Sequence, residues 1–286
     1  MLARRMAGIL PSLSTPESIE VTKVHSVAGI LPPGEGLIGT PPFRSPHHGI
    51  SSAGLVGGGP RPSPGEASLA HRGVLFLDEL PEFRRDALEG MRQPLEERVV
   101  SVVRARGAVR FPCDVLLVAA MNPCPCGFRG DPRRECACDS RERRRYARKL
   151  SGPLLDRIDL HVTVDAVDWK DLRDGSQGED SASIRLRVLE ARCRAAARRP
   201  GTPGFRNADL SAEEMATQCA LDHAGTRLLE NAVERVGLSV RAVHRGLRVA
   251  RTIADLAGSE RIRAAHLAEA LSLRAPAFAL LTERAG

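Results

Sequence analysis

The stretch Gly73-Val74-Leu75-Phe76-Leu77-Asp78-Glu79 decides the fold class of this chain. Four apolar residues stand between a glycine and two carboxylates, a pattern typical of a fully buried strand in a parallel sheet. The acidic pair then lies at the carboxyl end of the strand, where open α/β sheets bind their ligands. There Asp78 can hold Mg²⁺ beside nucleotide phosphates, and Glu79 can orient or deprotonate an attacking water. The alternative is a strand whose last two residues turn into solvent, so the remaining sequence must support the site.

The composition of the 286 residues is that of a globular protein, with 42% hydrophobic and 27% charged residues. Such a length allows one large or two ordinary domains with proper cores. No apolar run approaches the roughly 20 residues of a membrane span, and residues 1–11 lack the apolar core of a signal peptide. We therefore expect a cytoplasmic protein that does not use a membrane.

The net charge of +7 indicates an arginine-rich, basic surface. Such a surface favours polyanions such as nucleic acid, although many basic proteins bind none. Aromatic residues make up only 3% of the chain, which argues against base stacking. Any DNA contact would be made to the phosphate backbone and would weaken with salt.

Local patterns divide the chain into an α/β part and a helical part. In the α/β part we expect strands near 42–43 and at 74–78, 99–103, 107–111, 115–120 and 160–164, the one at 115–120 buried, and helices at 1–10, 16–27, 84–92, 140–149 and 154–158. In the helical part we expect helices at 184–198, 211–219, 223–236, 240–257 and 264–271, with a capping box formed by Ser211 and Glu214. The predicted domains are 1–165, a linker at 166–181, and 182–286.

Three polar residues downstream of the heptad extend the pattern of a nucleotide site. Asn122 follows the strand at 115–120 and could sense the γ-phosphate or position the water. Arg157, in a short exposed helix, could reach the phosphates of a neighbouring subunit, and Arg241, at the start of a helix, could close over the nucleotide. Taken singly, each is better explained as a strand cap or a surface arginine, but their order along the chain supports a shared site.

With these residues in place, the chain resembles the ComM/YifB-type magnesium-chelatase-like proteins, which are AAA+ ATPases. The resemblance rests on PFRSPHH at 42–48, GVLFLDELPEF at 73–83, AMNPCPCG at 120–127, LLDRIDL at 154–160 and RVARTIADL at 248–256. It implies an α/β AAA+ core with a parallel sheet, followed by an all-helical lid domain. It also implies a ring, expected to be hexameric, and in the best-known members a branch-migration helicase that acts on DNA during recombination.

The resemblance assigns a role to each site residue. It implies ATP and Mg²⁺ as cofactors, with Asp78 and Glu79 as the Walker B pair, Asn122 as sensor 1, Arg157 as arginine finger and Arg241 as sensor 2. The chain departs from the family pattern at its beginning. Family members carry a Lon-like domain and a Gly-rich Walker A loop before the helix that matches residues 1–5, and no G-x-x-x-x-G-K-[ST] occurs in the 286 residues. We therefore expect a truncated, incomplete core that binds ATP very weakly and hydrolyses it negligibly.

Two other functions stay open. A non-hydrolysing subunit could join a ring and lend Arg157 and its lid to a neighbour, as the resemblance permits. A metal chelatase that inserts Mg²⁺ into a porphyrin is the third possibility. An in-frame Gly-rich loop directly upstream of the Met1 codon would support a truncated ATPase, whereas an unrelated upstream sequence would support the non-hydrolysing subunit.

Four of the seven cysteines have a spacing that suits a metal. Cys124-x-Cys126 is followed, after nine residues, by Cys136-x-Cys138. Two close pairs of thiolates fit a tetrahedral, structural Zn²⁺, although two intervening residues within a pair are more usual than one. The alternative is four reduced thiols in a surface loop. The other cysteines, Cys113, Cys193 and Cys219, are expected to pack in the core.

Basic residues gather around this cysteine knuckle and at the predicted hairpin. Residues 129–149 include nine basic and four acidic side chains. DNA contacts are therefore expected at Arg104 and Arg106 of the hairpin and at Arg143, Arg144 and Arg145, with a solvated basic surface as the alternative. His47 and His48 lie in a loop, where as neighbours they are expected to point apart and to form a poor metal pair.

Overall fold

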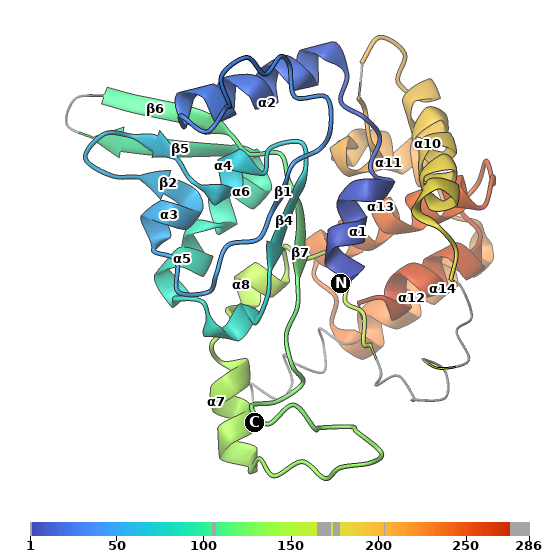
Figure 1. Ribbon diagram of the computed structural model, residues 1–286. Helices are drawn as coiled ribbons and strands as arrows, with labels where there is room; N and C mark the ends of the chain where they lie inside the picture. The colour runs from blue at the N-terminus through green and yellow to red at the C-terminus, as the bar shows by residue number, and fades with distance from the viewer. Residues whose placement is uncertain (1, 105–106, 165–172, 174–177, 203, 275–286) are drawn as a thin grey trace. The chain divides into compact units, whose positions relative to one another are not determined.

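The computed structural model of the chain describes residues 2–104, 107–164, 173, 178–202 and 204–274 (Figure 1). The chain forms two compact units, the first ending at Arg157 and the second beginning at Ile158. Residues 166–172 and 174–177 of the predicted linker lie outside the described residues, as does residue 165. Among the residues described, no helix has the length and apolar character needed to cross a membrane.

A parallel sheet in the order β1-β4-β7 positions the first unit's acidic pair: β1 (Phe43–Arg44), β4 (Val74–Leu77) and β7 (Leu116–Ala119). Val74 lies opposite Phe43 on one side and Leu116 on the other. Because β4 has a partner on each side, Val74 and Leu75 are completely buried. The mixed α/β class and the buried parallel strand predicted from the heptad are confirmed.

Two strand predictions fail in part or in full. β7 forms, but Leu116 is 39% exposed, because β7 pairs only with β4 in the part of the chain that the structure describes. The expectation that this strand is fully buried is therefore wrong. The predicted strand at 160–164 is absent, and Leu160, Val162 and Val164 are exposed. A lone extended segment without a ladder partner cannot satisfy its backbone groups as a strand does.

An antiparallel hairpin confirms the prediction at 99–111 and consists of β5 (Val99–Arg104) and β6 (Gly107–Pro112). Its residues Val100 and Phe111 face each other in register and are buried. Arg106, predicted at the tip, lies outside the described residues. A shorter antiparallel pair, β2 (Gly57–Gly58) and β3 (Ser63–Pro64), forms within the Gly- and Pro-rich segment.

The helices of the first unit surround these strands: α1 (Leu2–Ile9), α2 (Thr15–Val27), α3 (Ser52–Val56), α4 (Glu66–Leu69), α5 (Arg85–Gly90), α6 (Arg92–Glu97), α7 (Ser140–Ala147), α8 (Gly152–Leu155) and the 3₁₀ turn η1 (Leu80–Glu82). The helix predicted at 84–92 ends at Gly90 as α5, and α6, which was not predicted, follows after Met91. Pro94 has no N–H to donate to the Gly90 carbonyl, so the helix cannot continue unbroken through this turn.

Among the described residues from 181 onward the second unit is helical, as predicted, with α10 (Ser181–Ala197), α11 (Ala212–Gln218), α12 (His223–Val236), α13 (Val240–Leu256), α14 (Ala264–Ser272) and the 3₁₀ turn η2 (Asn207–Asp209). The predicted capping box is present: Ser211 Oγ accepts the N–H of Glu214, and Glu214 accepts the N–H of Ser211. Side chains from several of these helices and their loops, including Leu210, Ala250 and Leu267, form the core.

A buried carboxylate joins three elements of the second unit. Asp255 on α13 is 1% exposed and accepts hydrogen bonds from Arg251 at 3.1 Å, Arg198 at 2.7 Å and the Asn207 amide at 2.7 Å. Arg251 also donates to the carbonyls of Ser259 and Glu260. The buried carboxylate holds these elements together, because the loss of any partner would leave a buried charge without compensation.

Candidate nucleotide site and cysteine cluster

Neighbouring parallel strands bring three of the predicted site residues together. Leu77 of β4 pairs with Ala119 of β7, so both strands end at the same edge of the sheet. Asp78, Glu79 and Asn122 follow these ends and line one cavity of about 440 Å³. The heptad's acidic pair therefore lines a recess shared with Asn122, although both residues remain exposed to solvent.

The backbone turns sharply at Glu79. This residue adopts a left-handed conformation with φ 52° and ψ 47°, which is uncommon for a residue with a side chain and is concentrated at functional sites. The N–H of Glu79 donates to Asp78 Oδ1 at 3.0 Å, and the next N–H, of Leu80, donates to the Ala120 carbonyl at 2.9 Å. The turn thus ends β4 while the chain stays bonded to the end of β7.

His48 is a site residue that the sequence did not predict. Its Nδ1 lies 3.0 Å from Glu79 Oε2, and its ring packs edge-on against Phe83. The rings of His47 and His48 are 4.0 Å apart between centroids, so the expectation that they point apart is wrong. The sequence held one signal for this contact, because the two histidines follow the strand in PFRSPHH. Since β1 runs parallel to β4, the residues after both strands lie at the same edge of the sheet.

The opposite wall of the cavity comes from α7 and the turn after it. Arg145, Tyr146 and Lys149 line it, together with Glu82 from η1. Lys149 Nζ lies 2.9 Å from both carboxylate oxygens of Glu82. Partial burial, together with the negative charge of Glu82, raises the pKa of Tyr146 above its ordinary value. The lining therefore carries the carboxylates Asp78, Glu79, Glu82 and Glu142 and the cations Arg145 and Lys149, and the excess of carboxylates suits a divalent cation.

The two arginines predicted to act on the nucleotide, Arg157 from a neighbouring subunit and Arg241 from the lid helix, lie outside this cavity's lining. Arg157 follows α8, and its side chain is only 8% exposed: Nη2 lies 2.8 Å from Glu96 Oε2, and Nη1 donates to the Pro153 carbonyl at 2.7 Å. Arg241 belongs to the second unit, where it is exposed in the first turn of α13 after the N-cap Ser239. The starting position predicted for this helix is thus correct.

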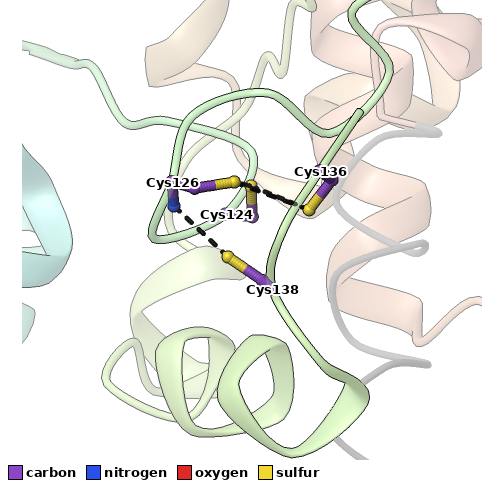
Figure 2. Close-up of side chains that lie close together, drawn as sticks. All are labelled: Cys124, Cys126, Cys136 and Cys138. Atoms are coloured by element: carbon purple, nitrogen blue, oxygen red, sulfur yellow. Dashed lines mark hydrogen bonds between the residues drawn. The ribbon is translucent and has the colours of Figure 1, made fainter. Parts of the chain in front are cut away.

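The four clustered cysteines lie in the loop between β7 and α7 (Figure 2). Their sulfur atoms all lie within 4.8 Å of one another. A backbone N–H of Phe128 lowers the pKa of Cys126 to about 6, whereas burial raises the pKa of Cys138 to about 12.

The isolated cysteines differ from one another. Cys113 and Cys219 are buried, as expected, and burial raises the pKa of each thiol, to about 12 and about 11. Cys193, by contrast, is exposed on α10, so the expectation that it packs in the core is wrong. Exposure on this helix follows from its position on the face away from the buried Ala191 and Ala195.

Three of the predicted DNA contacts lie together on α7, and a fourth lies on the hairpin. Arg145 lines the cavity, and Arg143 donates to the Cys138 carbonyl at 2.7 Å, so both face the loop and site instead of a separate surface. Arg144 is half-buried on α7. Arg104 is the last residue of β5. These positions alone do not define a nucleic-acid groove.

Family models match nearly all of the described chain. The model described as magnesium chelatase, subunit ChlI, matches residues 1–172, and the model of the C-terminal part of the same subunit matches residues 178–274. The division between the two matches falls within the predicted linker.

Curated relatives are similar over 96% of this chain. An uncharacterized protein of Mycobacterium tuberculosis is 46% identical over 280 residues, the competence protein ComM of Haemophilus influenzae 45% over 282 residues, and the uncharacterized protein YifB of Escherichia coli 42% over 277 residues. These matches cover 53–54% of the relatives, so the chain spans about half the length of the curated relatives it matches.

Proposed function

Since the chain belongs to the magnesium chelatase subunit ChlI family, we propose that its first unit supplies the metal- and water-binding side of an ATP-hydrolysing site. The observation that carries the proposal is the shared cavity of Asp78, Glu79 and Asn122 at the ends of two parallel strands. Ligands of open α/β sheets bind at this edge.

The donor groups of the cavity fit Mg²⁺ and a nucleotide. Asp78 offers the carboxylate oxygen that a hard cation prefers, and Lys149 offers a positive charge to phosphate. When bound, Mg²⁺ would offset the negative charge on the β- and γ-phosphates. Glu79 would accept a hydrogen bond from the attacking water, with His48 holding the carboxylate in place, and Asn122 would orient that water through its amide.

Phosphate binding by this chain is expected to be weak. No G-x-x-x-x-G-K-[ST] occurs in its 286 residues, and that loop supplies backbone N–H groups and a lysine to the phosphates. The affinity for Mg·ATP should therefore be in the millimolar range, equivalent to about 4 kcal/mol of binding free energy.

The wider role that we propose is an ATP-driven ring that remodels DNA. The support is indirect: one relative is named a competence protein, and residues 129–149 are strongly basic. In such a ring Arg157 would act on a neighbouring subunit's nucleotide and Arg241 on its own. Arg157 would first have to leave Glu96 and the Pro153 carbonyl.

Saturation-transfer NMR on the protons of ATP tests the nucleotide site in the intact 286-residue chain. We expect a signal that requires Mg²⁺, disappears in EDTA and is lost in Asp78→Asn. The matched control is Asp86→Asn, an exposed carboxylate on α5 that pairs with Arg84 and should leave the signal unchanged. Binding that is equal with and without Mg²⁺, equal in Asp78→Asn, or undetectable at millimolar ATP would refute the proposal.

A non-hydrolysing ring subunit, which would lend Arg157 to a neighbouring subunit's nucleotide, is the second candidate. Such a subunit would bind Mg·ATP through this cavity without turnover. The DNA directly upstream of the Met1 codon separates the two functions: an in-frame Gly-rich loop supports the hydrolase, and an unrelated upstream sequence supports the second candidate.

A further inference from the structure

The loop between Asn122 and the α7 N-cap Asp139 has almost no apolar core of its own. Within residues 123–138, all of which the structure describes, Cys124 and Cys138 alone have buried side chains. Helices and strands are also absent from this stretch. Ordering each residue opposes folding by about 1–2 kcal/mol, so a loop of this length needs a source of stability other than apolar burial.

The sulfur atoms form a compact group in that loop. Cys124 Sγ lies 3.4 Å from Cys126 Sγ and 3.6 Å from Cys136 Sγ, and the last two sulfurs are 3.6 Å apart. Figure 2 shows the side chains of these three residues pointing toward one another, with Cys138 below them. A tetrahedral ion with metal–sulfur bonds of about 2.3 Å has sulfur–sulfur edges of about 3.8 Å. The observed spacing is close to that value and far from the roughly 2.05 Å of a disulfide.

We propose that Cys124, Cys126, Cys136 and Cys138 bind one Zn²⁺ as a structural ion. Four thiolates complete the tetrahedral coordination of zinc and leave no position for a reactive water. Sulfur ligands select zinc or iron and reject the hard Mg²⁺ that suits the neighbouring carboxylates. The chain would thus carry two chemically separate metal sites within one unit.

Backbone groups around the cysteines support the ligand geometry. The N–H of Cys126 donates to Cys138 Sγ at 3.3 Å, a hydrogen bond of the kind that orients metal-bound sulfur. Gly127 has a φ of +83°, and its N–H donates to the Cys124 carbonyl at 3.0 Å. This tight turn folds the chain back toward Cys124 directly after the first pair of ligands. Glycine adopts the turn without strain.

The charges near the cluster also match a zinc tetrathiolate, whose net charge is about −2 when all four sulfurs are ionised. Arg143 donates to the Cys138 carbonyl at 2.7 Å. Arg134 lies over the ring of Phe128 at 3.9 Å and belongs to the same loop. The positive charge of Arg143, bonded to the backbone of a ligand residue, would offset part of the negative charge.

The ion would fix one wall of the neighbouring cavity. Cys124 lies two residues beyond Asn122, and Cys138 directly precedes Asp139, the N-cap of α7. Because α7 carries Arg145 and Tyr146 into the cavity, a metal that joins both ends of the loop would set the distance between Asn122 and this helix. The zinc proposal stands whether or not the cavity binds a nucleotide.

Metal analysis of the 286-residue protein, purified without chelator, is the first test. We expect about one zinc per chain and, after exchange, the intense visible absorption of tetrahedral cobalt bound by thiolates. Cys193→Ser removes the exposed cysteine outside the cluster and should keep the zinc, whereas Cys124→Ser with Cys136→Ser should lose it. Zinc well below one per chain, iron in its place, or a disulfide between any two of the four cysteines would overturn the proposal.

Limited trypsin digestion tests the loop in case the double variant fails to fold. Wild-type protein should resist cleavage after Arg129, Arg133 and Arg134, become sensitive when a mercurial reagent and a chelator remove the metal, and recover when the thiols are regenerated and zinc is returned. Cleavage in the loop that is equally fast in zinc-loaded and stripped wild-type protein would refute the structural role. This readout does not depend on nucleotide binding.

Discussion

His48 Nδ1 lies 3.0 Å from Glu79 Oε2, which links the loop after β1 to the carboxylate that ends β4. Both side chains are partly exposed, at 33% and 58%. Glu79 also has a left-handed backbone, so its direction is set both by the turn and by this imidazole. The contact therefore positions the carboxylate and adds little to the stability of the fold.

A double-mutant cycle with His48→Ala and Glu79→Gln checks this assignment. We expect a coupling free energy below about 1 kcal/mol in chemical denaturation, because exposed pairs contribute little. His48→Gln should behave like wild type in stability. A coupling of several kcal/mol would instead identify the pair as a structural ion pair.

Gly73→Ala should destabilise the first unit strongly. A Cβ at this position would lie 2.0 Å from the Pro42 carbonyl oxygen, where β1 and β4 meet. Overpacking against backbone typically costs about 1–3 kcal/mol or more. Gly36→Ala is the control, since no atom lies within 4 Å of its added Cβ. Hydrogen exchange of the β4 amides measures the stability of both variants. Unchanged protection in Gly73→Ala would contradict the close approach of Gly73 to Pro42.

Asp255→Ala should destabilise the second unit by about 3–5 kcal/mol, because it leaves Arg251 and Arg198 without their buried carboxylate. The control is Glu179→Ala, which removes an exposed partner of Arg187 and should change stability by less than about 1 kcal/mol. Denaturation, monitored through hydrogen exchange of the α13 amides, measures the stability of both variants. Equal stability of the two variants would show that the buried network is unimportant.

The first unit should lose stability as the pH falls below neutrality. Burial lowers the pKa of His71 from its ordinary 6.5, and the imidazole accepts the N–H of Asp114 through Nδ1. As the pH falls below 6.5, the unfolded chain binds a proton that the folded chain does not, so the free energy of unfolding decreases until the lowered folded pKa is passed.

Glu20, which lies 3.1 Å from His71 Nε2, acts in the same direction at lower pH. Burial raises the pKa of this carboxyl, but hydrogen bonds from His71 and Arg72 outweigh that effect and lower it below 4.5, so its contribution is lost as the pH falls through the folded pKa. His71→Gln should flatten the decline between about pH 7.5 and about pH 5.5. A wild-type stability that rises on acidification would contradict the sign.

The predictions that succeeded depend on short-range patterns. Four apolar residues ahead of Asp78 specify a buried strand, and the apolar and capping patterns that start at Ser239 specify α13 within one residue at each end. The predictions that failed concern neighbours distant in sequence. Leu116 and Val162 have strand-like sequences, but pairing decides burial and strand formation, and no local pattern reports the partner.

The sequence by itself determined the parallel α/β core, the helical second unit and the acidic pair after β4. Hydrophobic periodicity and the residues that form turns and caps act within a few residues of the chain. The tertiary structure alone decided that His48 reaches Glu79, that Glu96 holds Arg157 and that four sulfurs lie within 4.8 Å of one another. Each of these relationships depends on where the backbone returns in space, which follows from packing between distant segments.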